Sequence, residues 1–197
     1  MSIETKPQNL RGPWTSGFAP HVHTLSSTYL GDDPWGHPRY STTRSPVGEL
    51  LYQLKYRGDK KAIAQLAETA ASFCKHTWKL KIDVIVPVPP SQSRRVQPVL
   101  EIARALAELL QVKLCIDGLR KVKRTPQLKD LTDYDEREEA LREAFAISPD
   151  EIKGKRLLLF DDLYGSGATA RTIAQALTKE GGAKTVHLLT LTKKASG

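Results

Sequence analysis

The chain has 197 residues, of which 30 are lysine or arginine and 22 are aspartate or glutamate, so its formal net charge is +8. Because 40% of the residues are hydrophobic and 26% are charged, the composition is that of a globular protein and excludes disordered, collagen-like and disulfide-stapled chains. Apolar runs such as 157–160 and 186–189 are far shorter than the roughly 20 residues that cross a bilayer, which excludes a membrane span. Residues 1–10 lack the apolar core of a signal peptide, and Cys74 and Cys115 are isolated, so we expect a cytoplasmic protein.

Residues 1–46 differ in composition from the rest of the chain. They contain six of the 12 prolines and two of the three tryptophans, with little hydrophobic periodicity. Such a pattern predicts extended loops or short strands. We therefore divide the chain into an N-terminal arm or cap, residues 1–46, and a main domain, residues 47–197.

The spacing of apolar residues in the first half of the main domain predicts three helices and one strand. Residues 50–54 predict a short amphipathic helix that stops near Gly58, and apolar residues three and four apart predict a second helix over 63–74. The β-branched run 82–86 is closed by prolines and predicts a strand. An apolar stripe over 99–110 predicts the helix that follows this strand.

The second half of the main domain continues the alternation. The run 157–160 is apolar without polar alternation, which indicates a strand buried on both faces, as in a parallel sheet. A weak strand is predicted over 114–122, a charged helix over 135–143 and a short strand over 144–147. A helix over 170–177 that ends at two glycines and a last strand over 185–191 follow. Strands that alternate with helices predict an open, mainly parallel, twisted sheet flanked by helices.

The most informative segment is the run 157–169. A buried strand delivers Asp161 and Asp162 at its carboxyl end, where open α/β sheets bind ligands, and a loop of small residues then opens a helix. Backbone N–H groups at the start of that helix, together with the hydroxyls of Ser166 and Thr169, would form a phosphate cradle. The structural alternative is that the acids cap the strand and the glycines only make a tight turn.

The two acids narrow the choice of ligand. Carboxylates repel a phosphate, so Asp161 and Asp162 imply sugar hydroxyls or a hydrated Mg²⁺ beside it. No lysine follows the loop as a Walker A sequence requires, and the segment lacks the third glycine of a dinucleotide-binding loop.

The run 157–169 resembles the phosphoribosyl diphosphate (PRPP) motif of type I phosphoribosyltransferases. The resemblance implies a Rossmann-like fold with a mobile flap, in which Asp161 and Asp162 contact the ribose hydroxyls. It also implies that the following loop holds the 5′-phosphate. By position, this loop comprises Tyr164, Gly165, Ser166, Gly167, Ala168 and Thr169. Gly165 stands where the family commonly has threonine, which removes a hydroxyl donor but keeps the backbone donors.

Further segments are similar to the competence-associated ComF-type branch of this family. They are Leu54-Lys55-Tyr56-Arg57-Gly58-Asp59, Val86-Pro87-Val88-Pro89 and Arg124-Thr125-Pro126-Gln127, with Leu131, Arg137 and Ala144-Phe145-Ala146, and the resemblance covers residues 47–192. Two features depart from that branch. The N-terminal four-cysteine zinc ribbon is absent, and Val96-Gln97-Pro98 replaces the usual Gly-Phe-Asn-Gln segment.

The loop after the first strand of the main domain should reach the same edge of the sheet as the acid pair. In type I enzymes this loop binds pyrophosphate, which here implies Val88, Pro89 and Pro90. Arg94 and Arg95 could then pair with the diphosphate. The alternative is that these arginines form a solvated helix start.

Charge is segregated between residues 113 and 143. Residues 113–129 carry six basic side chains and one acid, whereas residues 130–143 carry seven acids and two arginines. In the family this position is a flap that closes over PRPP, so Lys121, Lys123 and Arg124 are candidates to reach the pyrophosphate. A solvated hairpin and a nucleic-acid patch remain alternatives, although residues 114–129 contain no stacking aromatic.

The combined expectation is an enzyme that binds PRPP with Mg²⁺ near Asp161 and Asp162 and transfers the phosphoribosyl group to an unidentified nitrogenous acceptor, with pyrophosphate released. The arm would then be a hood that borders the acceptor site. Its histidines have no cysteine nearby, so we expect no zinc there. Two other functions stay open: a non-catalytic PRPP-binding regulator or DNA-uptake accessory, and a basic nucleic-acid-binding protein. The oligomeric state is open, and a dimer is compatible with the sequence.

Overall fold

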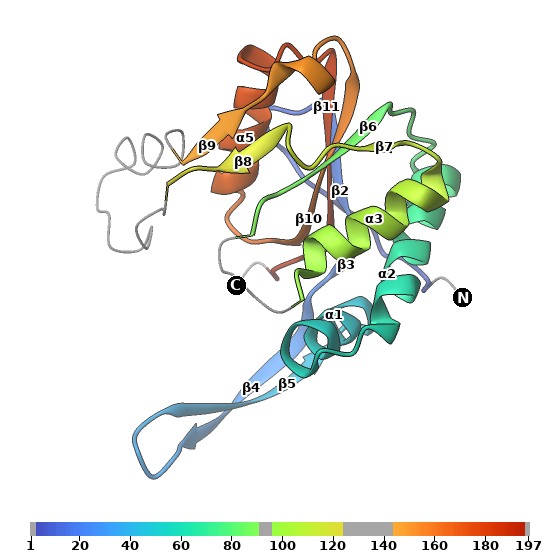
Figure 1. Ribbon diagram of the computed structural model, residues 1–197. Coiled ribbons are helices and arrows are strands. Elements are labelled where there is room, and N and C mark those ends of the chain that lie inside the picture. Colours follow the sequence, from blue (N-terminus) through green and yellow to red (C-terminus); the bar gives the residue numbers. More distant parts are fainter. Residues whose placement is uncertain (1–2, 91–95, 124–143, 196–197) are drawn as a thin grey trace.

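A seven-stranded sheet lies at the centre of the computed structural model, which describes residues 3–90, 96–123 and 144–195 (Figure 1). The strand order is β1-β2-β11-β10-β6-β7, and β3 also pairs with β11. Among the described strands of this sheet, all pairs are parallel except β1–β2, which confirms the predicted mainly parallel sheet. The strands are β1 (Gln8–Asn9), β2 (Ser16–Ala19), β3 (His21–Val22), β6 (Val84–Pro87), β7 (Lys113–Leu114), β10 (Arg156–Tyr164) and β11 (Thr185–Lys193).

Helices cover both faces of the sheet, as expected for this fold class. Helices α1, α2 and α3 share one buried cluster with one face, and α5 shares a second cluster with the other face. No helix in the described part of the chain is long and apolar enough to cross a membrane. The bounds are α1 (Pro46–Tyr52) with the π-helical turn Gln53–Arg57, α2 (Lys61–Ser72) with the π-helical turn Phe73–Thr77, α3 (Pro98–Leu110), a 3-10 turn (Pro149–Glu151) and α5 (Ala168–Lys179).

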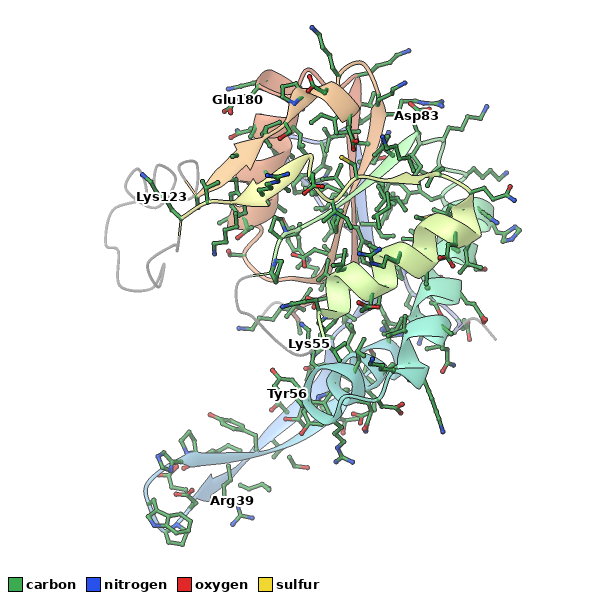
Figure 2. All side chains as sticks on the ribbon, viewed as in Figure 1. Arg39, Lys55, Tyr56, Asp83, Lys123 and Glu180 are labelled. Atoms are coloured by element: carbon green, nitrogen blue, oxygen red, sulfur yellow. The ribbon has the colours of Figure 1, made fainter. Side chains whose placement is uncertain are left out.

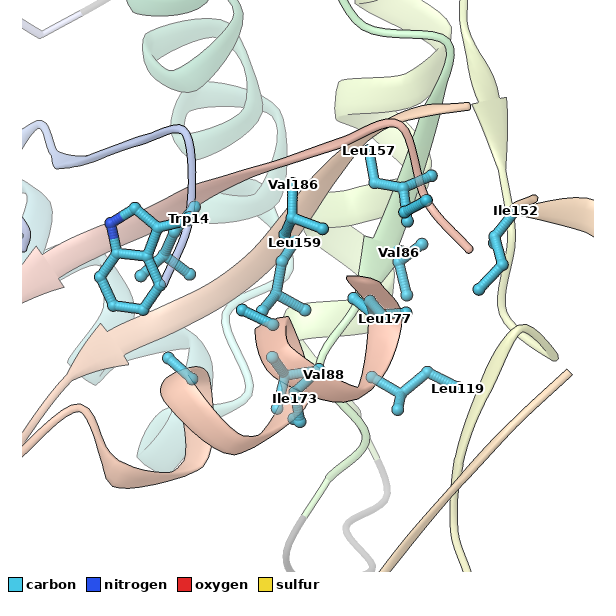
Figure 3. Close-up of a cluster of buried hydrophobic side chains, with 14 of the residues drawn as sticks. Trp14, Val86, Val88, Leu119, Ile152, Leu157, Leu159, Ile173, Leu177 and Val186 are labelled. Atoms are coloured by element: carbon cyan, nitrogen blue, oxygen red, sulfur yellow. The ribbon is translucent and has the colours of Figure 1, made fainter. Parts of the chain in front are cut away.

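Strand β10 is buried on both faces. Leu157 and Leu159 pack in the cluster beneath α5, whereas Leu158 and Phe160 pack in the cluster beneath α1, α2 and α3. All four side chains are fully buried, because successive residues of a strand point to opposite faces and both faces here are covered. Figure 3 shows the cluster beneath α5, which contains Leu157 and Leu159 together with Ile173 and Leu177.

The strand extends further than its apolar run. Its sequence pattern covers residues 157–160, but β10 continues to Tyr164 because β11 pairs with it through Asp161↔Thr190 and Leu163↔Thr192. Asp161 and Asp162 therefore lie within a strand, near its carboxyl end. Their backbone positions are set by the sheet, which is more rigid than a loop.

The weak strand expected over 114–122 is two separate strands. β7 (Lys113–Leu114) joins the edge of the central sheet, whereas β8 (Leu119–Lys121) pairs antiparallel with β9 (Phe145–Ile147) in a ribbon of its own. Gly118 separates the two pairings, and a Cβ there would collide with the Cys115 sulfur. The charged helix predicted over 135–143 lies outside the described residues.

The first 46 residues have two structural roles. Strands β1, β2 and β3 belong to the central sheet, where Trp14 is buried and its Nε1 donates a hydrogen bond to the carbonyl of Leu10 at 2.7 Å. Strands β4 (Thr24–Asp32) and β5 (Pro38–Arg44) instead form an antiparallel hairpin that projects away from the sheet (Figure 1). Part of this segment thus contributes to the core, and the domain division at residue 46 stays a prediction.

Candidate functional site

A cavity of about 860 Å³ opens at the carboxyl ends of β6 and β10. These strands are parallel neighbours, so the segments that follow them meet at one edge of the sheet. The cavity brings together most of the described residues that the sequence singled out, namely Val88, Pro89, Pro90, Lys121, Asp161, Asp162, Tyr164, Gly165, Ser166, Gly167, Ala168 and Thr169. Their functional roles stay predictions.

The two adjacent carboxyls have different partners. Asp162 Oδ2 lies 2.6 Å from Lys55 Nζ, and the two side chains are 13% and 20% exposed. Lys55 reaches the cavity from the π-helical turn that follows α1. Asp161 Oδ1 accepts a hydrogen bond from the Asp162 backbone N–H at 2.8 Å. One acid is thus paired with a cation, while the other is held by the backbone of its neighbour.

The Asp161 carboxyl is poised to hold a proton. Burial raises the pKa of Asp161 to about 8, and the nearby Asp162 carboxylate raises it as well. The Asp162 N–H and the Lys55 ammonium act in the opposite direction, but burial dominates. The acid pair in the ligand-free site therefore carries less negative charge than two ionised carboxylates would.

The small-residue loop forms the next wall of the cavity. Gly167 has φ 82° and precedes α5, and a Cβ at this position would collide with the Tyr164 hydroxyl. Gly165 and Ser166 are exposed, and Ala168 N–H lies 3.4 Å from Ser166 Oγ. The loop and the first residues of α5 line the cavity, and the N-terminus of a helix is where backbone N–H groups lack intrahelical partners and can bind a phosphate.

Arg171 supports the loop from the first turn of α5. Its Nη1 donates to the Ser166 carbonyl at 2.9 Å, which places a guanidinium beside the N-terminus of the helix. Sequence analysis missed both Arg171 and Lys55 as site residues. The signal for Lys55 was its position in the ComF-like segment 54–59, but nothing in the sequence shows that this segment meets Asp162.

A hydrogen-bond chain joins the acid pair to the base of the β4–β5 hairpin. Thr192 Oγ1 donates to the Asp162 carbonyl at 3.2 Å, and His23 Nδ1 lies 3.0 Å from the same hydroxyl. Because the hydroxyl hydrogen is used toward Asp162, His23 must donate from Nδ1. Burial lowers the pKa of His23, and Lys55 and Arg44 lower it further, so a neutral ring fits this role.

The wall opposite the acids is mainly apolar. It is built from the start of α3, from the segment between β7 and β8, and from the β8–β9 ribbon. Arg120 Nη2 and Asp117 Oδ1 form an ion pair at 3.0 Å on this wall, and both side chains are well exposed. The lining residues of this wall are Gln97, Pro98, Val99, Leu100, Ile116, Asp117, Leu119, Arg120 and Phe145.

Some predicted site residues do not meet in this cavity. Lys121 lines it, but Lys123 is described and is not among the lining residues. Arg94, Arg95 and Arg124 lie outside the described residues. No cavity-lining residue in the described part of the chain comes from residues 1–46, so the hood over an acceptor also stays a prediction.

The described residues contain no group of three or more histidine, cysteine or acidic side chains that could hold a metal ion. Asp161 and Asp162 offer adjacent carboxylate oxygens, which are the ligands that Mg²⁺ prefers, whereas the third carboxylate of the cavity, Asp117, is paired with Arg120. The donor set therefore fits a Mg²⁺ that is held largely by the oxygens of a bound substrate and by water.

Two curated proteins are similar to the chain in sequence, and no protein-family model matches it. Competence protein ComFC of Bacillus subtilis is 28% identical over 157 residues, which cover 76% of this chain and 61% of the relative. Competence protein F of Haemophilus influenzae is 30% identical over 146 residues, which cover 69% of this chain and 63% of the relative. The chain thus spans less than two thirds of the length of either relative.

A solved structure confirms the fold. Glutamine phosphoribosylpyrophosphate (PRPP) amidotransferase from Bacillus subtilis, complexed with ADP and GMP, matches with a TM-score of 0.52 and 20% identity over 81% of this chain and 34% of that chain. At this identity the match shows the fold alone. The chain has the type I phosphoribosyltransferase fold and is related to the ComF proteins, as its motifs predicted.

Proposed function

We propose that this ComF-related chain binds PRPP with Mg²⁺ in the cavity and transfers its phosphoribosyl group to a nitrogenous acceptor. One observation carries the proposal. Within a single cavity, the paired acids at the end of β10 are followed directly by backbone donors at the start of α5. A molecule that has vicinal hydroxyls next to a phosphate matches this order of groups.

The loop from Gly165 to Thr169 would hold the 5′-phosphate, with Arg171 adding positive charge beside it. Asp161 and Asp162 would accept hydrogen bonds from the ribose hydroxyls, and a protonated Asp161 could also donate one. Mg²⁺, when bound, supplies the charge that neutralises the diphosphate. Val88, Pro89 and Pro90 border the space into which the diphosphate would extend.

The chemistry needs no protein nucleophile. The bond from the anomeric carbon to the pyrophosphate oxygen breaks, the acceptor nitrogen forms a bond to the same carbon, and its proton is released. The carboxylate of Asp162 stabilises the positive charge that develops on the ribose, and Lys121 stabilises the leaving pyrophosphate. Positioning and exclusion of water supply the rest of the rate enhancement.

A second candidate is PRPP binding without turnover, in a competence-related role. The observation that favours it is that both sequence relatives are named competence proteins. A non-catalytic protein of this kind would keep the phosphate cradle and the acid pair, so binding alone does not separate the two functions. Turnover does.

Calorimetry with PRPP tests the proposal, with Mg²⁺ and with EDTA in separate titrations. We expect binding only with Mg²⁺, and loss of binding when Asp161→Asn and Asp162→Asn are combined. Asp150→Asn, which removes an exposed carboxylate that does not line the cavity, is the matched control. Unchanged PRPP affinity in the double variant would refute the site. Pyrophosphate release with a panel of free bases then separates the enzyme from the non-catalytic protein.

A further inference from the structure

The base of the β4–β5 hairpin is tied to the acid pair by two separate contacts on Asp162. Lys55 Nζ pairs with the Asp162 carboxylate at 2.6 Å, from the turn after α1, and Figure 2 shows Lys55 close to where the hairpin joins the helices. Thr192 Oγ1 donates to the Asp162 carbonyl, and His23, the residue before β4, contacts Thr192. None of the described residues of the N-terminal segment lines the cavity. Any effect of His23 on a ligand must therefore pass through other side chains.

The backbone of β10 changes its hydrogen-bonding direction at the acid pair. The Phe160 carbonyl accepts from the Val88 N–H at 2.8 Å, on the β6 side, whereas the Tyr164 carbonyl accepts from the Lys194 N–H at 2.8 Å, on the β11 side. Carbonyls an even number of residues apart point the same way in a regular strand, so the chain rotates between these two residues. A local disruption of this kind leaves peptide groups that need other partners.

Side chains supply such partners at Asp162. Its N–H donates to Asp161 Oδ1 at 2.8 Å, and its carbonyl accepts from the hydroxyl of Thr192 at 3.2 Å. Thr192 is fully buried, so its hydroxyl cannot exchange this bond for one to water. The hydroxyl thus helps to fix the main chain from which the Asp162 carboxylate extends and to which the Asp161 carboxyl is bonded.

His23 fixes the direction of the Thr192 hydroxyl. His23 Nδ1 and Thr192 Oγ1 are 3.0 Å apart. Since the hydroxyl uses its hydrogen toward Asp162, the ring donates from Nδ1, and Nε2 carries no hydrogen when the ring is neutral. The charged groups near the ring are Lys55, Arg44 and Asp162, and burial together with the two cations lowers the pKa of His23. The ring is therefore neutral, with its hydrogen on Nδ1.

The backbone of His23 is anchored where the two ends of the hairpin meet. Its N–H donates to the Lys193 carbonyl at 2.7 Å, and its carbonyl accepts from the Ser45 N–H at 3.1 Å. A Cβ at Gly48 would collide with the His23 carbonyl, so α1 packs directly against it. The position of the His23 ring is thus set by β11 and α1, and not by the projecting strands of the hairpin.

We propose that His23 is a positioning residue for the acid pair: it holds the Thr192 hydroxyl on the Asp162 carbonyl and thereby keeps both carboxyls in the geometry that receives the ribose hydroxyls. The inference rests on the proposed function, because PRPP is the ligand whose binding it concerns. It gives the N-terminal segment a role in the site that differs from a hood over the acceptor. A group displaced by about 1 Å loses much of its effect, so His23 can matter without contacting the substrate.

Calorimetry with PRPP and Mg²⁺ on paired variants tests the inference. His23→Leu and Thr192→Val should each weaken PRPP binding by about tenfold or more. The two together should weaken it no more than the stronger single change, since both break the same hydrogen-bond chain. His23→Asn and Thr192→Ser should retain most of the affinity, because the asparagine amide N–H replaces Nδ1–H and serine keeps the hydroxyl.

His187 provides a matched control near the start of β11. It is half-buried like His23, its Nδ1 lies 2.8 Å from Ser16 Oγ, and burial lowers its pKa as well. It does not line the cavity. His187→Leu should lower the free energy of unfolding, as His23→Leu does, yet leave the affinity for PRPP unchanged.

Nitrogen-15 NMR of the unaltered chain gives a test that needs no substitution. We expect the hydrogen of the neutral His23 ring on Nδ1, and a hydrogen on Nε2 would overturn the inference. Equal losses of PRPP affinity in His23→Leu and His187→Leu would overturn it as well, as would unchanged affinity in His23→Leu and Thr192→Val. If instead the unaltered chain does not bind PRPP, the proposed function itself fails and the inference falls with it.

Discussion

Lys55 Nζ and Asp162 Oδ2 lie 2.6 Å apart and join the helical layer to the end of the central strand β10. Alternation along β10 explains the pairing. Asp162 follows Leu158 and Phe160 on the face covered by α1, α2 and α3, where the turn after α1 delivers a lysine. The contact pairs the ionised Asp162 carboxylate with a cation and fixes it at the cavity wall.

Lys55→Met should destabilise the protein. Removal of the ammonium leaves the largely buried Asp162 carboxylate without this partner, so we expect the free energy of unfolding to fall by about 2 kcal/mol in urea titrations. When Lys55→Met is combined with Asp162→Asn, the loss should be smaller than the sum of the single losses, because an amide does not require a cation. Lys61→Met, at an exposed position on α2, is the control. Additive losses would show that the pair does not contribute to stability.

Gly167→Ala should lower the free energy of unfolding by more than its left-handed backbone alone explains. The residue has φ 82° and a new Cβ would also collide with the Tyr164 hydroxyl. Gly154 has φ 70° with open space around its Cβ position, so Gly154→Ala measures the backbone contribution by itself. We expect about 1 kcal/mol at Gly154 and a larger loss at Gly167, measured by chemical denaturation. Equal losses of unfolding free energy in the two variants would mean that the Tyr164 side chain moves away from the new Cβ without destabilising the protein.

The sequence predicted the elements whose information is local. The periodicity of residues 99–110 and the apolar run before Asp161 are sufficient for α3 and β10, because a helix stripe and a strand buried on both faces are each readable within one segment. Short strands were predicted for residues 1–46, but neither the bounds of β2 nor its place in the central sheet was. Only four residues long, it is placed by pairing with β11, far away in the sequence. Contacts such as Lys55 to Asp162 depend on such pairings, so no local pattern reveals them.

The stability of the protein should depend on pH through Asp161. Burial raises its pKa to about 8 in the folded state, whereas an unfolded aspartate titrates near about 3.9. Between these values the folded protein binds more protons than the unfolded chain, so its stability falls as pH rises through this range and levels off above about pH 8. Asp161→Asn should remove this part of the pH dependence. Unfolding free energies are measured for the unaltered protein and for Asp161→Asn from about pH 4 to about pH 9. Parallel profiles would contradict a raised pKa at Asp161.

Purified protein should contain no stoichiometric zinc. His21 is buried in β3, His23 bonds to Thr192, and His37 contacts Asp33 at the hairpin tip, so these three side chains serve separate sites. A structural zinc site needs four ligands at one point. Elemental analysis that finds about one zinc per chain would show that the N-terminal segment has been misinterpreted.

The basic segment at the end of β8 should act mainly in catalysis. Lys121 lines the cavity, and the predicted flap continues from it through Lys123 and Arg124. If these side chains reach the pyrophosphate only when the flap closes, their replacement by alanine removes contacts made chiefly in the transition state. We therefore expect the triple variant to slow pyrophosphate release far more than it weakens PRPP binding.

Steady-state kinetics and calorimetry on the same preparations separate this effect from a general loss of positive charge. The control variant replaces three exposed lysines that do not line the cavity, Lys153, Lys179 and Lys184, and so removes the same formal charge. It should retain both turnover and PRPP affinity. If both variants lose PRPP affinity equally, long-range charge attracts the ligand and the flap has no specific role. If only the flap variant loses affinity for DNA, with a shallower dependence of log K on log salt, and the unaltered chain neither binds nor converts PRPP, the segment serves nucleic-acid binding instead.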